Sequence, residues 1–287
     1  GALDNANFGK NDPKATRWSD SVLQGWGVRD NNWEISTEVQ HELTRSLSLT
    51  AGYYRNTGGY YRNSNSKQRV TDNILVGPAD FDSYCITAPS DPRLPGGGGY
   101  QVCGLSAIKP EKFGQVQTVV QPTGDFGTDK RVNDFIGFGL TARLPGGARV
   151  GGGLDTGRSV LDQCFAVDSA GMTSYSTSAT GSVPQTSTTI GGQQTCRVIT
   201  PFKAQTQVKL NGSLPLPQGF VASGVYQDLA GTPIFAAYAA TNAEIAPSLG
   251  RNLAGGARTA TVPLIVPQTL FEGRTRRLDL RVTKNFQ

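Results

Sequence analysis

Alternating apolar and polar residues dominate residues 33–53. In the first half, apolar residues alternate with polar and acidic ones: Trp33, Ile35, Val39 and Leu43 against Glu34, Ser36, Glu38, Gln40 and Glu42. In the second half, Leu47, Leu49, Ala51 and Tyr53 alternate with Ser48, Thr50 and Gly52. Because successive strand residues point to opposite faces, the pattern predicts a β-hairpin with one apolar and one polar face. The connection at residues 44–46 suits a three-residue hairpin turn.

The same pattern returns three more times. Residues 132–161 and 204–228 each predict a hairpin, turning at 145–147 and 217–219, and residues 277–286 predict one further strand. In the second hairpin Phe135 is the exception, since it lies on the polar parity. The predicted strands are about 10–14 residues long, whereas strands of soluble sheets usually have about 5–6.

Short and long connections alternate along the chain. The three short turns are separated by long, turn-rich stretches at residues 63–130, 162–203 and 229–273. Such lopsided connections are untypical of a β-sandwich and typical of an outer-membrane protein. The predicted fold class is therefore all-β. We expect residues 1–287 to form a single antiparallel outer-membrane-type β-barrel, or part of one, with short turns at one end and long disulfide-stapled loops at the other.

Seven predicted strands leave two edges, and unpaired strand edges in lipid are very costly. We therefore expect the strands to belong to a larger barrel, to close with strands not recognised here, or to pair with other chains. If they are the complete sheet, the alternative is a secreted or surface structural β-protein that self-associates into an oligomer or filament.

Composition supports a β-protein with polar loops. Of 287 residues, 36 are glycine, 37% are hydrophobic and 17% are charged. The sequence contains no run of about 18 apolar residues, so it predicts no transmembrane helix. The net charge is +5. The basic residues are scattered, and the densest group (Arg274, Arg276, Arg277 and Arg281) lies beside a predicted strand, so we expect no nucleic-acid partner.

The four cysteines predict two local disulfides. Cys85 pairs most simply with Cys103, and Cys164 with Cys196, each bracketing a turn-rich stretch. Four cysteines allow three connectivities, and four reduced thiols are the alternative. Disulfides indicate an oxidising compartment. With one histidine and no CxxC motif, a zinc site is not predicted.

No catalytic, cofactor or metal site is predicted. His41 is on the apolar parity of its strand, and no GxSxG motif or Ser-His-Asp set occurs. Residues 96–99 are glycines, but no helix or Lys-Ser/Thr follows them as in a phosphate-binding loop. Asp80, Asp82 and Asp91 do not have the spacing of a known calcium loop. Two carboxylates brought together by folding are the one enzymatic alternative left open.

Several segments carry a resemblance to a known family. They are GWGVRDNNWEISTEVQHEL, RVTDNILVGPADFDSYCITAPSDPRLPGGGGYQVCGL with KFGQV, NAEIAPSLGRNLAGG and RRLDLRVTKNF, which together span about residues 25–286. The chain resembles the C-terminal barrel part of TonB-dependent receptor-like outer-membrane proteins that carry a carboxypeptidase-regulatory-like domain, known from Acidobacteria and related bacteria. No segment of this sequence resembles their plug, TonB box or regulatory-like domain.

The resemblance implies a 22-stranded barrel in the outer membrane that takes up a nutrient with energy from the TonB system. Its partners would be outer-membrane lipid, the TonB system through a plug, and a nutrient ligand of unknown identity. The loops at 63–130 and 162–203 would form the extracellular ligand surface. The candidate stacking residues on these loops and the strand end beside them are Tyr60, Tyr61, Tyr84, Tyr100 and Tyr175.

Overall fold

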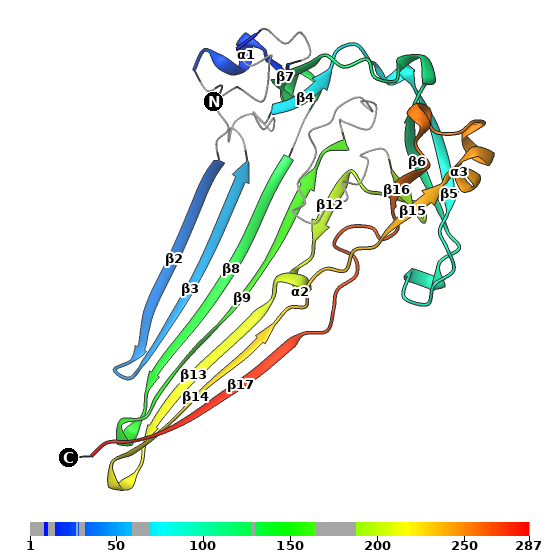
Figure 1. Ribbon diagram of the computed structural model, residues 1–287. Helices are drawn as coiled ribbons and strands as arrows, with labels where there is room; N and C mark the ends of the chain where they lie inside the picture. The colour runs from blue at the N-terminus through cyan, green and yellow to red at the C-terminus, as the bar shows by residue number, and fades with distance from the viewer. Residues whose placement is uncertain are drawn as a thin grey trace, which may run out of the picture.

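The computed structural model describes residues 9–10, 15–26, 28, 32–58, 69–127, 130–164 and 188–286. Its largest feature is an eight-stranded antiparallel sheet (Figure 1). From one edge to the other the strands are β2 (Asn32–Thr44), β3 (Leu47–Gly58), β8 (Lys130–Arg143), β9 (Arg149–Asp162), β13 (Gln207–Pro215), β14 (Phe220–Leu229) and β17 (Thr275–Lys284), and β12 (Arg197–Thr200) pairs with the end of β9.

The three predicted hairpins and the final strand are confirmed. The turns at Pro145–Gly147 and Pro217–Gly219 lie where the sequence predicts them. The first turn is shorter than predicted, because Thr44 pairs with Leu47 after a register shift next to Glu42. The extra residue of this irregularity leaves only Arg45 and Ser46 to make the turn.

The short turns all lie at one end of the long sheet, together with the C-terminus. The elements formed by the long connections, and the N-terminal segment, lie beyond the opposite end (Figure 1). Among the described strands β2 and β17 are the two edges, and they do not pair with each other. The structure therefore confirms a mostly β fold built on a long antiparallel sheet, and this sheet is open.

The long connections are themselves folded. They and the N-terminal segment carry β1 (Arg17–Trp18), α1 (Asp20–Leu23), β4 (Arg69–Asn73), β5 (Phe81–Thr87), β6 (Gln101–Ile108), β7 (Thr118–Pro122), β10 (Thr189–Ile190), β11 (Gln193–Gln194), α2 (Phe202–Gln205), β15 (Ala237–Thr241), α3 (Asn242–Leu249) and β16 (Thr259–Pro263). Single 3-10 turns occur at Pro78–Asp80, Pro95–Gly97, Pro110–Lys112, Thr123–Asp125 and Ala254–Gly256. No helix in the described ranges is long and apolar enough to cross a membrane.

One hydrophobic cluster, here called the loop core, joins all three long connections. Its buried residues are Tyr84, Ile86, Ala88, Leu94, Val102, Leu105, Ala107, Ile190, Ala240, Ile245, Val262, Leu264 and Ile265. They come from β5, β6 and the segment between them, from β10, and from β15, α3, β16 and the two residues after β16. Burial of each large apolar side chain is worth about 1.5–3 kcal/mol. The loop core therefore offsets the conformational entropy lost when these long connections become ordered.

Local hydrogen bonds fix α3 against the loop core. Thr241 caps the helix, and Glu244 accepts hydrogen bonds from the Thr241 backbone N–H at 2.7 Å and hydroxyl at 2.8 Å. At the other end, Gly250 takes the left-handed conformation that ends many helices. A bulge leaves the Cys85 N–H outside the β5–β6 ladder, and this group donates to Ser248 Oγ at 2.9 Å.

Arg251 joins the segment after α3 to the β5–β6 hairpin. Its Nη2 donates to Asp82 Oδ2 at 2.8 Å and to the carbonyl oxygens of Ala107 at 3.3 Å and Ile108 at 3.0 Å. Its side chain is 21% exposed. We expect Arg251→Met to destabilise the loop core by about 2–4 kcal/mol, because the partly buried carboxylate and two carbonyls lose their donor.

Hydrogen exchange of the β5 and β6 amides measures this effect. The matched control is Arg93→Met, which removes an ion pair with Asp91 from a side chain that is 88% exposed. The control should leave protection of β5 and β6 unchanged. Equal protection in both variants would show that Arg251 does not stabilise the loop core.

Both predicted disulfides are present. Cys85–Cys103 joins β5 to β6, and Cys164–Cys196 closes residues 164–196 beside the β9–β12 pair. Next to the second bridge, the Gln163 N–H donates to the Cys196 carbonyl at 2.9 Å. The predicted pairing is therefore correct, and the second disulfide fastens a short strand to the rim of the long sheet.

We expect Cys164→Ser combined with Cys196→Ser to loosen β12 without unfolding the long sheet. Loop-closure entropy for a bridge of this span is about 3–4 kcal/mol. The loss should appear as faster amide exchange in β12, with β8, β9 and β13 still protected. A fall of tens of degrees in the melting temperature of the whole sheet would contradict a local role.

Candidate functional site

The long sheet presents one continuous apolar face, here called the apolar band. Residues paired across an antiparallel sheet share a face, and the registers place the apolar parity of every long strand on the same side. Its exposed large side chains are Trp33, Ile35, Val39, Leu43, Tyr53, Ile136, Phe138, Leu140, Val150, Leu210, Leu214, Phe220, Leu278, Leu280 and Val282. None of the described elements covers them.

The apolar band ends at a row of charged pairs on its loop side. Arg55 and Asp134 form an ion pair at 3.1 Å, and the Tyr53 hydroxyl donates to the same carboxylate at 2.7 Å. Nearer the other edge, Arg274 pairs with Asp228 at 2.6 Å. Asp228 on β14 is level with Phe138 on β8, so the boundary lies four residue positions closer to the turns on β14 than at Asp134, as expected where strands are tilted relative to the band. The band therefore has a sharp polar limit.

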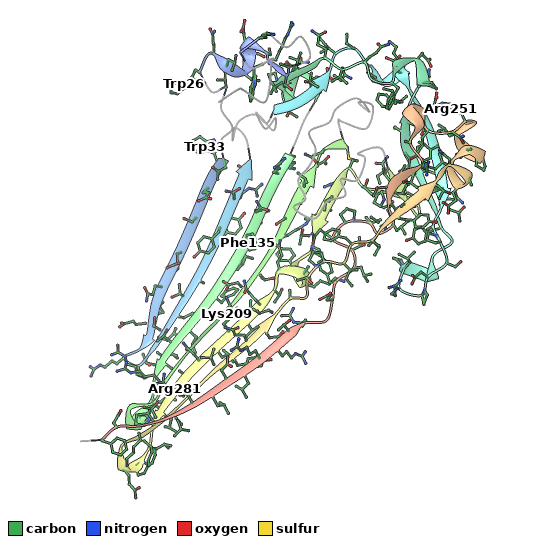
Figure 2. The ribbon with its side chains drawn as sticks, viewed as in Figure 1. Trp26, Trp33, Phe135, Lys209, Arg251 and Arg281 are labelled. Carbon is green, nitrogen blue, oxygen red and sulfur yellow. A yellow bond between two sulfur atoms is a disulfide. The ribbon has the colours of Figure 1, made fainter. Side chains whose placement is uncertain are left out.

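Glycines and two aromatic rings shape the opposite, polar face. The Tyr54 ring lies over Gly52, and its hydroxyl donates to Glu38 at 2.8 Å. Phe135, labelled in Figure 2, packs over Gly157 in the same way. In the sequence pattern Phe135 is an apolar residue on the polar parity of its strand. The structure shows the reason, because the missing side chain of Gly157 provides the space for its ring.

We expect Gly157→Ala to destabilise the sheet by about 1–3 kcal/mol through overpacking. A Cβ on Gly157 would collide with the Phe135 ring and lie 2.8 Å from the Asp134 carbonyl oxygen. The control is Gly139→Ala on the same face, whose Cβ would meet nothing nearer than Thr50 Cβ at 3.7 Å. Urea titrations of the two variants test the difference, and equal midpoints would contradict it.

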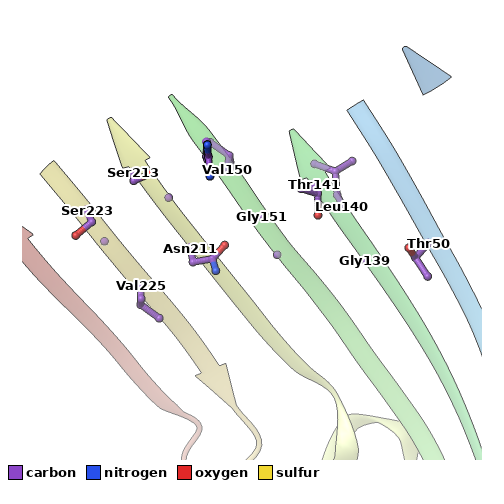
Figure 3. A pocket seen from close by; sticks show the side chains of 14 residues that line it. Thr50, Gly139, Leu140, Thr141, Val150, Gly151, Asn211, Ser213, Ser223 and Val225 are labelled. Carbon is purple, nitrogen blue, oxygen red and sulfur yellow. The ribbon is translucent and has the colours of Figure 1, made fainter. Parts of the chain in front are cut away.

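A hollow of about 490 Å³ lies on the polar face near the turns (Figure 3). Glycine backbone forms much of its floor. Hydroxyl, amide and guanidinium groups surround it, and the lining residues that carry them are Thr50, Thr141, Arg149, Asn211, Ser213 and Ser223. The hollow holds no carboxylate. Its polar side chains are therefore all hydroxyl, amide or guanidinium groups.

Of the candidate stacking tyrosines, Tyr84 and Tyr100 lie in the described part of the chain, and both belong to the loop core. Tyr84 is 3% exposed, so its ring packs inside the loop core and not on a loop surface as expected from the sequence. Tyr100 packs against the same core, and its hydroxyl donates to the Leu264 carbonyl. Burial raises the pKa of both phenols. Tyr60, Tyr61 and Tyr175 lie outside the described residues.

The three carboxylates considered for calcium each have a protein partner. Asp82 pairs with Arg251 at 2.8 Å, and Asp80 with Lys112 at 3.6 Å. Asp91 accepts from Arg93 at 2.6 Å, and this hydrogen bond lowers the pKa of Asp91 to about 2. Among the described residues no group of three or more His, Cys, Asp or Glu side chains could hold a metal ion. The three aspartates therefore form ion pairs that hold the turns and the loop core together.

No protein-family model, curated protein or solved structure matches this chain. The arrangement of its own residues is therefore the basis for any functional assignment.

Sequence reasoning missed two features of the polar face. The first is the set of glycines beneath Tyr54 and Phe135, which could have been found by aligning the predicted hairpins across their turns. The second is the pair Arg143 and Arg149, which lie two residues before and two residues after Pro145–Gly147. Two residues at equal distances from a hairpin turn lie opposite each other, so the pairing of the two arginines could have been predicted from the sequence.

Proposed function

We propose that this chain forms part of the wall of an outer-membrane β-barrel of the TonB-dependent receptor type, whose loop side binds a nutrient for uptake. The observation that carries the proposal is the uncovered apolar band. Soluble monomers rarely expose a contiguous apolar patch larger than a few hundred Å². This band extends over seven strands, so a lipid environment accounts for it better than water does.

The size of the apolar band supports the same proposal. On β2 the exposed apolar side chains reach from Trp33 to Leu43, which is ten residue steps of ~3.4 Å or ~34 Å along the strand. A tilt of ~40° projects this length to ~26 Å, and outer-membrane barrels have an apolar band ~25 Å tall. The polar face would then line the lumen, and the ion pairs around Asp134 and Asp228 would lie at the outer interface.

The loop core supports a binding role for the outer side. Recognition residues commonly lie on loops held by a rigid scaffold. Here the long connections share one core and are fastened by Cys85–Cys103 and Arg251. A nutrient would therefore meet a preformed surface. Such a receptor would work with outer-membrane lipid around it and with the TonB system through a plug.

The second candidate is a structural β-protein that assembles through strand edges. It is favoured by the two open edges of the long sheet, at β2 and β17. In that case the apolar bands of several copies would cover one another. The assembly would remain in aqueous buffer and sediment as a large particle, whereas the receptor would require detergent for extraction.

We expect Leu140→Arg to prevent stable insertion of the protein into the outer membrane. Leu140 lies in the middle of the apolar band and is 42% exposed. Arginine facing lipid at the bilayer midplane costs about 2–4 kcal/mol. The yield of heat-modifiable, detergent-extracted protein from outer membranes measures insertion.

The control is Thr141→Arg, the next residue, which faces the polar side of the sheet. This variant should insert as well as the original protein, because its guanidinium faces away from lipid. If Leu140→Arg inserts as well as Thr141→Arg, or if both proteins are extracted by buffer alone, the membrane proposal is wrong.

A further inference from the structure

A row of basic and hydroxyl side chains crosses the polar face next to the turns. The registers place Arg143 opposite Arg149, Arg149 opposite Ser213, Ser213 opposite Ser223, and Ser223 opposite Arg281. All five side chains belong to the same face, because paired residues of an antiparallel sheet point to the same side. We call these residues the arginine row.

The arginine row carries uncompensated positive charge. Like charges directly opposite each other on neighbouring strands destabilise a sheet, and Arg143 and Arg149 are such a pair. Within the described part of the chain neither has an ion pair with a carboxylate, and neither does Arg281. The nearest acid along β17, Asp279, is paired with Arg277 at 2.7 Å. The fold thus retains a repulsion that an anion would relieve.

The surroundings of Arg149 match the chemistry of an oxyanion. Arg149 lines the hollow of about 490 Å³, together with Thr141, Asn211, Ser213 and Ser223 (Figure 3). A guanidinium group offers a planar fork of N–H donors, and hydroxyl and amide groups add further donors. Gly139 and Gly151 leave the floor open, so an anion can approach the row. No carboxylate in the lining would repel it.

We propose that the arginine row is a binding site for a phosphate or sulfate group. Arg149 binds the anion directly, the Ser213 hydroxyl donates a hydrogen bond, and Arg143 and Arg281 supply charge from the two ends of the row; the Ser223 hydroxyl donates to the Arg281 carbonyl at 3.5 Å. Arginine is suited to this role because its fork matches tetrahedral oxyanions in a bidentate manner. The site depends on the sheet register alone, and it does not require that the sheet lie in a membrane.

The test is the thermal stability of the full chain in detergent as inorganic phosphate is titrated at constant ionic strength, with chloride as the balancing anion. A ligand that binds the folded state raises the melting temperature with concentration. We expect phosphate to raise it in the original protein. Arg149→Gln should weaken the apparent affinity at least tenfold, and Ser213→Ala should weaken it to a smaller extent.

Two controls separate binding from general effects. Arg93→Gln removes an exposed arginine far from the row, so its phosphate response should equal that of the original protein. Without phosphate, Arg149→Gln should melt at the same or a higher temperature, because it removes the repulsion with Arg143. A loss of stability without phosphate would instead indicate a purely structural arginine and overturn the proposal.

The same titration with a sugar phosphate identifies the source of the anion. Tighter binding of the sugar phosphate assigns the anion to a larger molecule that fills the hollow, and equal affinity assigns it to the free ion. Either result supports the site if Arg149→Gln weakens the affinity for the anion at least tenfold. A response to phosphate that is the same in the original protein and in Arg149→Gln overturns it. Insertion of Arg149→Gln into membranes should be unaffected, so the failure of this site leaves the barrel proposal intact.

Discussion

The structure depends on one physical constraint: a long single-layer sheet must have its apolar face covered by something other than water. In this chain the only extended hydrophobic core among the described residues is the loop core, which lies beyond the end of the sheet. The sheet itself is held by backbone hydrogen bonds and cross-strand contacts, not by a second layer. Its stability is therefore tied to its surroundings, whether lipid or further copies of the chain.

Two different devices keep this sheet in register. Along the strands, apolar and polar residues alternate, so a slip of one residue would exchange the faces of a whole strand. On the polar face, glycines receive the rings of Tyr54 and Phe135, and this interlocking works only in one alignment. At the rim, Arg55 with Asp134 and Arg274 with Asp228 join the strand ends by charge. Lipid-facing residues need only be apolar, so the contacts on the polar face and at the rim are the ones that select a single strand register.

The long sheet could be predicted from sequence because its signals are local. Alternation of period two defined β2, β3, β8, β9 and β17, and turns such as Pro145–Gly147 fixed which strands are neighbours. The loop core could not be predicted, because it joins residues as distant as Leu105 and Ile245 without any periodic pattern. For the same reason Tyr84 was assigned to a surface when it is buried. The disulfide pairing was predictable because each bridge closes one connection.

The direction of the edge strands has a consequence for how copies or further strands can join. With seven strands alternating in direction from β2 to β17, both edges run from the loop side toward the turns. Two copies in the same orientation could join β17 to β2 only as a parallel pair. In an antiparallel junction between two copies, one copy would be inverted, so the two loop cores would lie at opposite ends of the joined sheet. To extend the antiparallel pattern in a membrane, the next strand at either edge must run from the turn side toward the loop side. Because this chain supplies seven long strands, a closed barrel with an even strand number needs an odd number of further strands.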